Sequence, residues 1–171
     1  MPHRIRVRIA ETRDVAAMHA LLQPFADRHL ILPRSRDDLF QHLQEFIVAE
    51  YDGEIAGVAS VHVYGSTLAE VRSLAVSPTQ QGAGLGQLLV EACEKLAAEL
   101  GVKRLFALTY VPGFFEKIGY EVVPKESLPH KIWTVCVHCA KFSHCDEVAV
   151  EKALPRVSKG HAPIIEVEQA A

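Results

Sequence analysis

The sequence has no unbroken apolar run of about 18 residues, the length a helix needs to span a bilayer. It also lacks an apolar leader, because Arg4, Arg6 and Arg8 alternate with apolar residues in the manner of a strand rather than a signal peptide. Charge of one sign is scarce, and a net charge of −3 gives no reason to expect nucleic acid or an anionic membrane as a partner. We therefore expect a cytoplasmic protein that binds neither.

Cysteine is also scarce, and four cysteines without secretory context argue against disulfides. There is no internal repeat or low-complexity tract, and a length of 171 residues fits a single domain. We expect that domain to cover residues 1–153. Residues 154–171 have the Pro, Gly and polar content of a disordered tail. The oligomeric state stays open, a homodimer included.

Two common phosphate-binding motifs, G-x-G-x-x-G and the P-loop, are absent. In their place a glycine-rich stretch, residues 81–86, separates a strand-like run at 71–76 from a helical pattern that extends to Leu100. The first amides of a helix lack partners and carry the positive end of its dipole. Glycines at 82, 84 and 86 allow positive φ and close approach of a phosphate. This predicts a pyrophosphate site; the alternative is an ordinary helix start with flexible glycines.

Apolar periodicity predicts strands at residues 4–9, 46–51, 55–64, 70–76, 104–108 and 120–123. A first helix is expected from Thr12 as N-cap to about Pro24, which should end or kink it. Further helices are expected after Ser35, from the glycine stretch to Leu100, and at 114–118. Asp52-Gly53 predicts a tight hairpin, and Gly101 is placed to end the long helix. This order of elements predicts an α/β fold with helices packed on a mixed sheet.

The pattern Gln-x-x-Gly-x-Gly directly after Ala-Val-Ser-Pro resembles the acyl-CoA-binding motif of the GNAT acetyltransferase superfamily, and the order of elements is similar to that fold, a mixed, mainly antiparallel sheet flanked by helices. The resemblance implies acetyl-CoA as co-substrate, with its pyrophosphate on the loop amides. Its pantetheine arm would enter between two splayed strands, where backbone groups of Leu74 and Val76 hold the arm and the thioester carbonyl. The residues implied to contact acetyl-CoA are Leu74, Ala75, Val76, Gln81, Gly82, Ala83, Gly84, Leu85, Gly86 and Phe115.

Residues 32–36, 108–120 and 128–145 resemble the N-acetylglutamate synthase branch, in particular its short bacterial members, so that the similarity covers roughly residues 4–150. It implies direct acetyl transfer to the α-amine of L-glutamate, a step toward arginine in many bacteria. The chain has no amino-acid kinase domain, so arginine inhibition is not expected to follow the longer synthases. Alternative acceptors are another amino acid, a polyamine or a protein N-terminus, and a CoA-binding module without turnover is a third hypothesis.

Arg34 is the first candidate for a substrate carboxylate, because a guanidinium binds such a group with two hydrogen bonds. The alternative is a solvated loop cation. By resemblance, Arg72 and Lys131 are further substrate-binding candidates.

Glu70 is the candidate general base, placed where related enzymes often hold a carboxylate that acts through water; the alternative is a surface glutamate at a strand end. His62 on the neighbouring strand is a second candidate base, or a structural histidine. Phe115 stands where many GNAT enzymes have a tyrosine that protonates the departing thiolate, which leaves Tyr110 as the substitute candidate acid.

Cys136, Cys139 and Cys145 have ligand types suited to zinc, and C-x-x-C is the right local spacing. A second pair of ligands is missing from the sequence around them. The strand-like run before them would equally place these cysteines as small buried hydrophobic residues. We expect no metal. Cys93, within the long helical pattern, is expected in the core.

Overall fold

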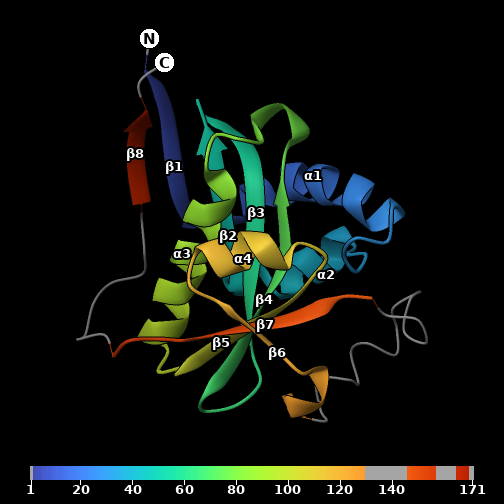
Figure 1. Cartoon of the computed structure of the whole chain (residues 1–171). Coiled ribbons are helices and arrows are strands. Elements are labelled where there is room, and N and C mark those ends of the chain that lie inside the picture. The colour runs from blue at the N-terminus through green and yellow to red at the C-terminus, as the bar shows by residue number, and fades with distance from the viewer. Residues whose placement is uncertain (1, 130–145, 157–164, 170–171) are drawn as a thin grey trace.

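The computed structural model describes residues 2–129, 146–156 and 165–169. Lys131 and the three cysteines at 136, 139 and 145 lie outside these ranges. Within them, the strands form one eight-stranded mixed sheet in the order β6-β7-β5-β4-β3-β2-β1-β8 (Figure 1). The strands are β1 His3–Ile9, β2 Phe46–Tyr51, β3 Glu54–Val63, β4 Leu68–Val76, β5 Arg104–Thr109, β6 Glu121–Val123, β7 Val148–Ala153 and β8 Ile165–Gln169.

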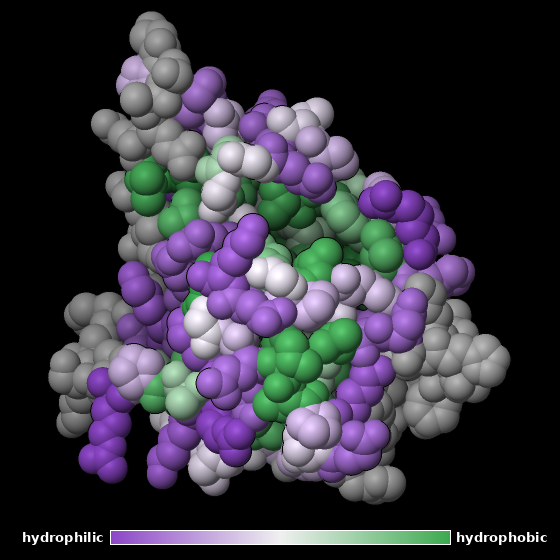
Figure 2. Space-filling view, viewed as in Figure 1, coloured by the Kyte–Doolittle hydropathy of each residue, from purple (hydrophilic) through white to green (hydrophobic). Residues whose placement is uncertain are grey.

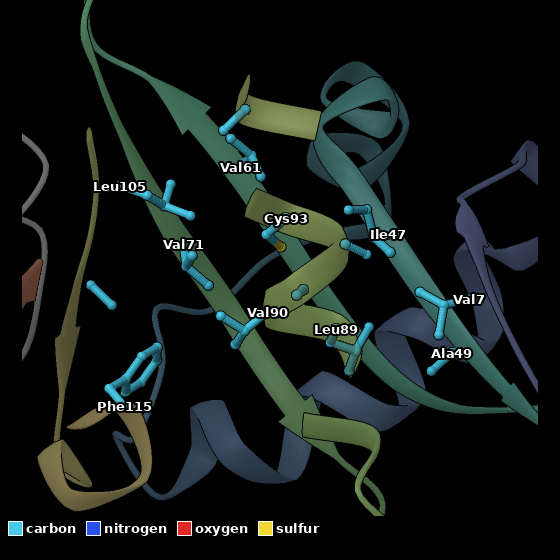
Figure 3. Packing of buried hydrophobic residues seen from close by; sticks show 14 of the residues in the cluster. Val7, Ile47, Ala49, Val61, Val71, Leu89, Val90, Cys93, Leu105 and Phe115 are labelled. Atoms are coloured by element: carbon cyan, nitrogen blue, oxygen red, sulfur yellow. The ribbon is translucent and has the colours of Figure 1, made fainter. Parts of the chain in front are cut away.

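Helices cover both faces of the sheet. They are α1 Val15–Asp27, α2 Arg36–Gln41, α3 Leu85–Glu99 and α4 Pro112–Lys117, with short 3-10 turns η1 Thr12–Asp14, η2 Leu43–Glu45, η3 Pro78–Gln80 and η4 Lys125–Ser127. The apolar stripe of α3 packs on one face, where Leu89, Val90 and Cys93 point toward the strands (Figure 3). The apolar side of α1 packs on the opposite face with Leu39 of α2. The sheet is therefore buried on both sides, and most residues of its central strands β3 and β4 are apolar.

Most local signals act as expected. Asp52 and Gly53 both have positive φ, 51° and 86°, which is the two-residue turn that matches the twist of a hairpin. The Ser35 hydroxyl accepts a hydrogen bond from the Asp38 amide at 3.1 Å and caps α2.

The predicted N-cap of the first helix was wrong, and of the two outcomes predicted for Pro24, an end or a kink, the end was wrong. Thr12 does not cap it, because residues 12–14 form a 3-10 turn and the α-helix begins at Val15. It also continues past Pro24 to Asp27. Proline removes one backbone hydrogen bond to the preceding turn of the helix. The helix continues because Met18 and Leu22 are buried against the sheet, and this packing stabilises it.

Strands β4 and β5 are parallel, and they pair over three residues only, from Leu68↔Arg104 to Glu70↔Phe106. Beyond this point both continue without pairing to each other. A bulge lies in β4 at the same level, since the register with β3 shifts between Val58 and Ser60 and Ser73 adopts φ 52°. Bulges bend a strand and increase its twist. The predicted splay is present, and it leaves a gap beside the second half of β4.

Two strands were not predicted from the sequence. β7 lies between β5 and β6 and is antiparallel to both. β8 pairs with β1 from His3↔Gln169 to Val7↔Ile165, so the expected disordered tail forms a strand over these five residues. Val167 of β8 packs against the main apolar cluster. No helix in the described ranges is long and apolar enough to cross a membrane.

Candidate active site

A cavity of about 800 Å³ opens at the gap between β4 and β5. The segment after α1, the glycine stretch, the start of α3 and the segment from the end of β5 into α4 complete its wall. Apolar residues gather between α1 and α4 on this face (Figure 2). The predicted site residues that line the cavity are Arg34, Glu70, Arg72, Leu74, Ala75, Val76, Gln81, Gly82, Gly84, Leu85, Gly86, Tyr110 and Phe115. Ala83 does not line it and packs against the core instead.

Two of the three loop glycines have the backbone conformation that was expected. Gly82 has φ 92°, and Gly84, the N-cap of α3, has φ 84°; a Cβ at either position would meet no atom within 4 Å. Only the left-handed backbone therefore requires glycine there. The expectation for Gly86 was wrong, since it lies inside α3 without positive φ. A Cβ there would come within 3.3 Å of Phe114 Cζ, so Gly86 permits close packing of α3 on α4.

The N-terminus of α3 faces the cavity with free donors. Its first bond of helical type runs from the Leu88 amide to the Gly84 carbonyl at 3.2 Å, and no side chain of the described residues caps it. The preceding amides therefore carry the positive end of a 15-residue helix at the cavity wall. Gln81 is tied back by Nε2, which donates to the Val76 carbonyl at 3.3 Å. This arrangement suits a diphosphate.

The gap beside β4 suits an extended arm that carries amide groups. Leu74, Ala75 and Val76 line it where β4 still pairs with β3 but no longer with β5, so the strand presents N–H and C=O groups on its β5 side. Phe115 forms part of the opposite wall. Its ring is 3% exposed and packs edge-to-face on Phe114 and Tyr120, at 5.1 Å between centroids in each case. Together with the α3 terminus, these features fit acetyl-CoA.

A carboxylate, a guanidinium and a phenol meet on the β4 wall. Arg72 Nε donates to Glu70 Oε1 at 2.6 Å, and the Tyr64 hydroxyl donates to the same oxygen at 3.0 Å. Arg72 Nη2 also contacts the Tyr64 hydroxyl. Glu70 is only 6% exposed, so it is not a surface glutamate. Burial, and then the charge of Glu70, raise the pKa of Tyr64 well above its usual range. Sequence reasoning missed Tyr64, which lies directly after β3; its spacing of two residues from His62 was the available signal.

Arg34 lies in the cavity wall rather than in solvent. Its side chain is 11% exposed, its Nη1 donates to Asp38 Oδ2 at 2.9 Å, and its guanidinium lies 5.2 Å from the centre of the Phe46 ring. These contacts exclude the solvated loop cation. Arg34 and Arg72 both line the main cavity and also a smaller cavity beside it. Two guanidinium groups therefore approach one space from different elements.

The remaining candidates are less close to the cavity or outside the described ranges. Tyr110 lines the cavity directly after β5, whereas His62 lines the smaller cavity and not the main one. Within residues 2–129, 146–156 and 165–169, no three His, Cys, Asp or Glu side chains are grouped as metal ligands would be. Cys93 is fully buried in the core, and burial raises the pKa of its thiol.

A protein-family model described as the acetyltransferase (GNAT) family matches residues 14–120. The chain belongs to this family, and the fold and cavity are those of a GNAT N-acetyltransferase that takes its acetyl group from acetyl-CoA. The match runs from the turn before α1 through the glycine stretch to the segment after α4, so it includes every described element of the cavity wall except Glu147.

Two relatives and one solved structure show which acetyltransferases the chain is similar to. The chain is 39% identical to an uncharacterized N-acetyltransferase of Chlorobaculum tepidum, over 86% of this chain and 96% of the relative. It is 35% identical to an amino-acid acetyltransferase of Mycobacterium tuberculosis, over 67% of each. The N-acetylglutamate synthase of Neisseria gonorrhoeae, solved with coenzyme A and N-acetyl-glutamate, superposes with a TM-score of 0.80 at 27% identity. That match covers 89% of this chain and 35% of the synthase, so the chain corresponds to about a third of that protein.

Proposed function

We propose that the chain transfers the acetyl group of acetyl-CoA to the α-amine of L-glutamate. The observation that carries this proposal is the pair of guanidinium groups, Arg34 and Arg72, in the wall of one cavity beside the buried carboxylate of Glu70. Glutamate brings two carboxylates, which need cationic partners, and one amine, which must lose a proton. The likeness to a synthase solved with N-acetyl-glutamate supports the same acceptor.

Arg34 and Arg72 have donors to spare for the acceptor. A guanidinium has five N–H donors, and Arg34 directs one nitrogen, Nη1, at Asp38. Stacking over Phe46 holds its plane in place, which reduces the entropy lost when a carboxylate binds. Arg72 is oriented by Glu70 and Tyr64. We assign one acceptor carboxylate to each arginine, and Lys131, outside the described ranges, remains a further predicted contact.

Glu70 is the proposed base for the acceptor amine. Both of its hydrogen bonds reach Oε1, so the second oxygen, Oε2, is the one directed to the ammonium group or an intervening water. The bound donor supplies an acetyl thioester. Unpaired backbone N–H groups of β4 at Leu74 and Val76 would stabilise the negative charge that develops on its carbonyl oxygen. Phe115 has no hydroxyl, so Tyr110 remains the proposed acid for the thiolate.

The test is release of free CoA thiol from acetyl-CoA by the purified chain across a panel of amines that includes L-glutamate, L-glutamine, other amino acids, a polyamine and a peptide N-terminus. We expect turnover with L-glutamate well above the other acceptors. Turnover with a different amine would discard the acceptor and keep the enzyme class. Tight acetyl-CoA binding without turnover on any amine would favour a binding module.

With L-glutamate as acceptor, the reaction belongs to arginine biosynthesis, and we place it in the cytoplasm. Support for this comes from the amino-acid acetyltransferases to which the chain is similar. Whether arginine inhibits this chain is the next question if the acceptor is L-glutamate.

A further inference from the structure

A second cavity, of about 330 Å³, lies beside the main one and shares Leu32, Arg34 and Arg72 with it. Its other lining residues are Pro33, Asp38, His42, Glu45 and His62. No residue of the glycine stretch or of α4 takes part. The second cavity thus opens on the acceptor side of the site, and the binding of acetyl-CoA does not account for its charged groups.

His62 connects this cavity to the Glu70 wall. In the β3–β4 ladder His62 stands directly opposite Glu70, and opposite residues of an antiparallel pair project from the same face. The His62 ring also packs edge-on against the Tyr64 ring, with centroids 4.9 Å apart, and the Tyr64 hydroxyl donates to Glu70. His62 is therefore a neighbour of the proposed base although it lines the other cavity.

Glu45 of η2 determines which nitrogen of His62 carries the proton. Glu45 Oε2 lies 3.4 Å from His62 Nδ1, and its Oε1 lies 3.3 Å from His42 Nδ1. Burial acts to raise the pKa of Glu45, but the hydrogen bonds and charges of His62 and His42 outweigh it and lower that pKa. An ionised carboxylate only accepts hydrogen bonds, so Nδ1 of His62 donates and Nε2 is left to accept a proton.

Charged groups from several elements surround His62. The groups concerned are Glu45 from η2, Tyr64 directly after β3, Glu70 and Arg72 from β4, Asp38 and His42 from the α2 segment, and Arg34 from the segment before it. Among the described residues, two arginines stand against three carboxylates, which leaves an excess of one negative charge while both histidines are neutral. The His62 side chain is 28% exposed, so a proton on it can pass to water.

We propose that His62, oriented by Glu45, receives the proton that the acceptor amine loses and delivers it to solvent through the second cavity. This rests on the proposed function. The ammonium group gives one proton to Glu70, which passes it to His62 Nε2. The neutral amine then forms the C–N bond, the C–S bond breaks, Tyr110 protonates the departing thiolate, and the second N–H proton of the amine restores the Tyr110 hydroxyl. One proton leaves per turnover, and His62 is a positioning and relay residue that acts through Glu70.

The test compares His62→Gln, His62→Ala and His3→Gln. His3 is the matched control, because it forms the same kind of pair with Asp52 at 2.9 Å and lines neither cavity. We expect kcat to fall roughly 10²-fold in both His62 variants, and the pH profile of kcat/KM to change. Added imidazole should restore part of the activity of His62→Ala. His3→Gln should keep the wild-type profile.

An independent readout is the tautomer of the His62 ring in the free protein, measured by 15N NMR of the imidazole. Glu45→Gln should reduce the share of the tautomer protonated at Nδ1, because it removes the carboxylate to which Nδ1 donates, and should leave the tautomer of His3 in place. An unchanged pH profile in a folded His62→Gln variant would overturn the relay, as would a loss of activity that imidazole does not restore. If the wild-type chain acetylates no amine, the proposed function fails by itself. The tautomer measurement still decides the relay, which an unchanged His62 tautomer in Glu45→Gln would refute.

Discussion

Buried charges in this protein occur in pairs or triads, at the site and away from it. Arg8 is 4% exposed and donates to Asp14 at 2.7 and 2.9 Å and to Glu50 at 2.7 Å, joining β1, β2 and the turn before α1. Glu70 and Arg72 repeat the arrangement in the cavity wall. Removing one member of such a group leaves the other charge desolvated without compensation. The Arg8 group joins structural elements and the Glu70–Arg72 pair lies in the cavity wall, but in both cases pairing compensates for the desolvation of the charges.

Asp14→Asn should destabilise the fold by about 3 kcal/mol near pH 7, because it leaves Arg8 with reduced compensation. Burial acts to raise the pKa of Asp14, but the hydrogen bond from Arg8, the Glu11 amide and the charge of Arg8 together lower it. The contribution of Asp14 is thus complete above its unfolded pKa of about 3.9 and is lost as pH falls through the lower folded value. Urea unfolding of both proteins from pH 7 to pH 3 should show a narrowing gap; a constant gap would contradict this assignment.

Arg34→Ala should raise the KM for the amino-acid acceptor roughly tenfold or more, since a charge-assisted pair to a carboxylate contributes about 1.5–3 kcal/mol. Binding of CoA should be unaffected. Arg36→Ala is the matched control, because Arg36 is exposed in the first turn of α2 and lines neither cavity. Steady-state kinetics with the acceptor varied at saturating acetyl-CoA measure both. Equal KM values for the two variants would remove Arg34 from the site.

Among the elements, the turn into α3 is the one most specialised for a ligand. Gly84→Glu should reduce affinity for CoA at least tenfold, because it puts a carboxylate at the anion-binding helix terminus and strains a left-handed residue. Gly53→Glu carries the same backbone strain, at φ 86° in the hairpin turn away from the cavity. Calorimetric titration with CoA should show weaker binding for Gly84→Glu only. Urea unfolding should show a similar decrease in the free energy of unfolding, roughly 1–2 kcal/mol, in both variants. Matching CoA affinities would refute the loop assignment.

Sequence reasoning succeeded where the signal is local. Alternation gave β1 to β6 to within about two residues, and the Asp52-Gly53 pair and the glycine stretch were placed correctly because turn chemistry is written in adjacent residues. It missed β7 and β8, whose partners are distant in the chain. It also missed the role of Gly86, which depends on Phe114, and the contacts of Glu45 with His62 across 17 positions. Side-chain pairing of this kind follows from tertiary structure and not from spacing.

At the scale of the whole molecule, β8 covers the edge of β1. A chain ending at Arg156 should expose the unpaired N–H and C=O groups of β1, and exposed edges pair with other chains. We expect this variant to be less stable and to associate, as measured by thermal unfolding and by light scattering after size-exclusion chromatography. Acetyl transfer per folded chain should persist, because β3, β2 and β1 separate β8 from the gap beside β4. If the shortened chain stays monomeric with unchanged stability, β8 does not protect the edge of β1.

The short pairing between β4 and β5 divides the sheet into a part made of β8, β1, β2, β3 and β4 and a part made of β5, β7 and β6, joined through three residue pairs. Because so few residue pairs join the two parts, we expect them to unfold separately. Amide hydrogen exchange would then record two cooperative units. A donor lying in the gap would contact both parts. Binding of acetyl-CoA would then make the two parts unfold as one cooperative unit, so that the co-substrate also stabilises the sheet that binds it.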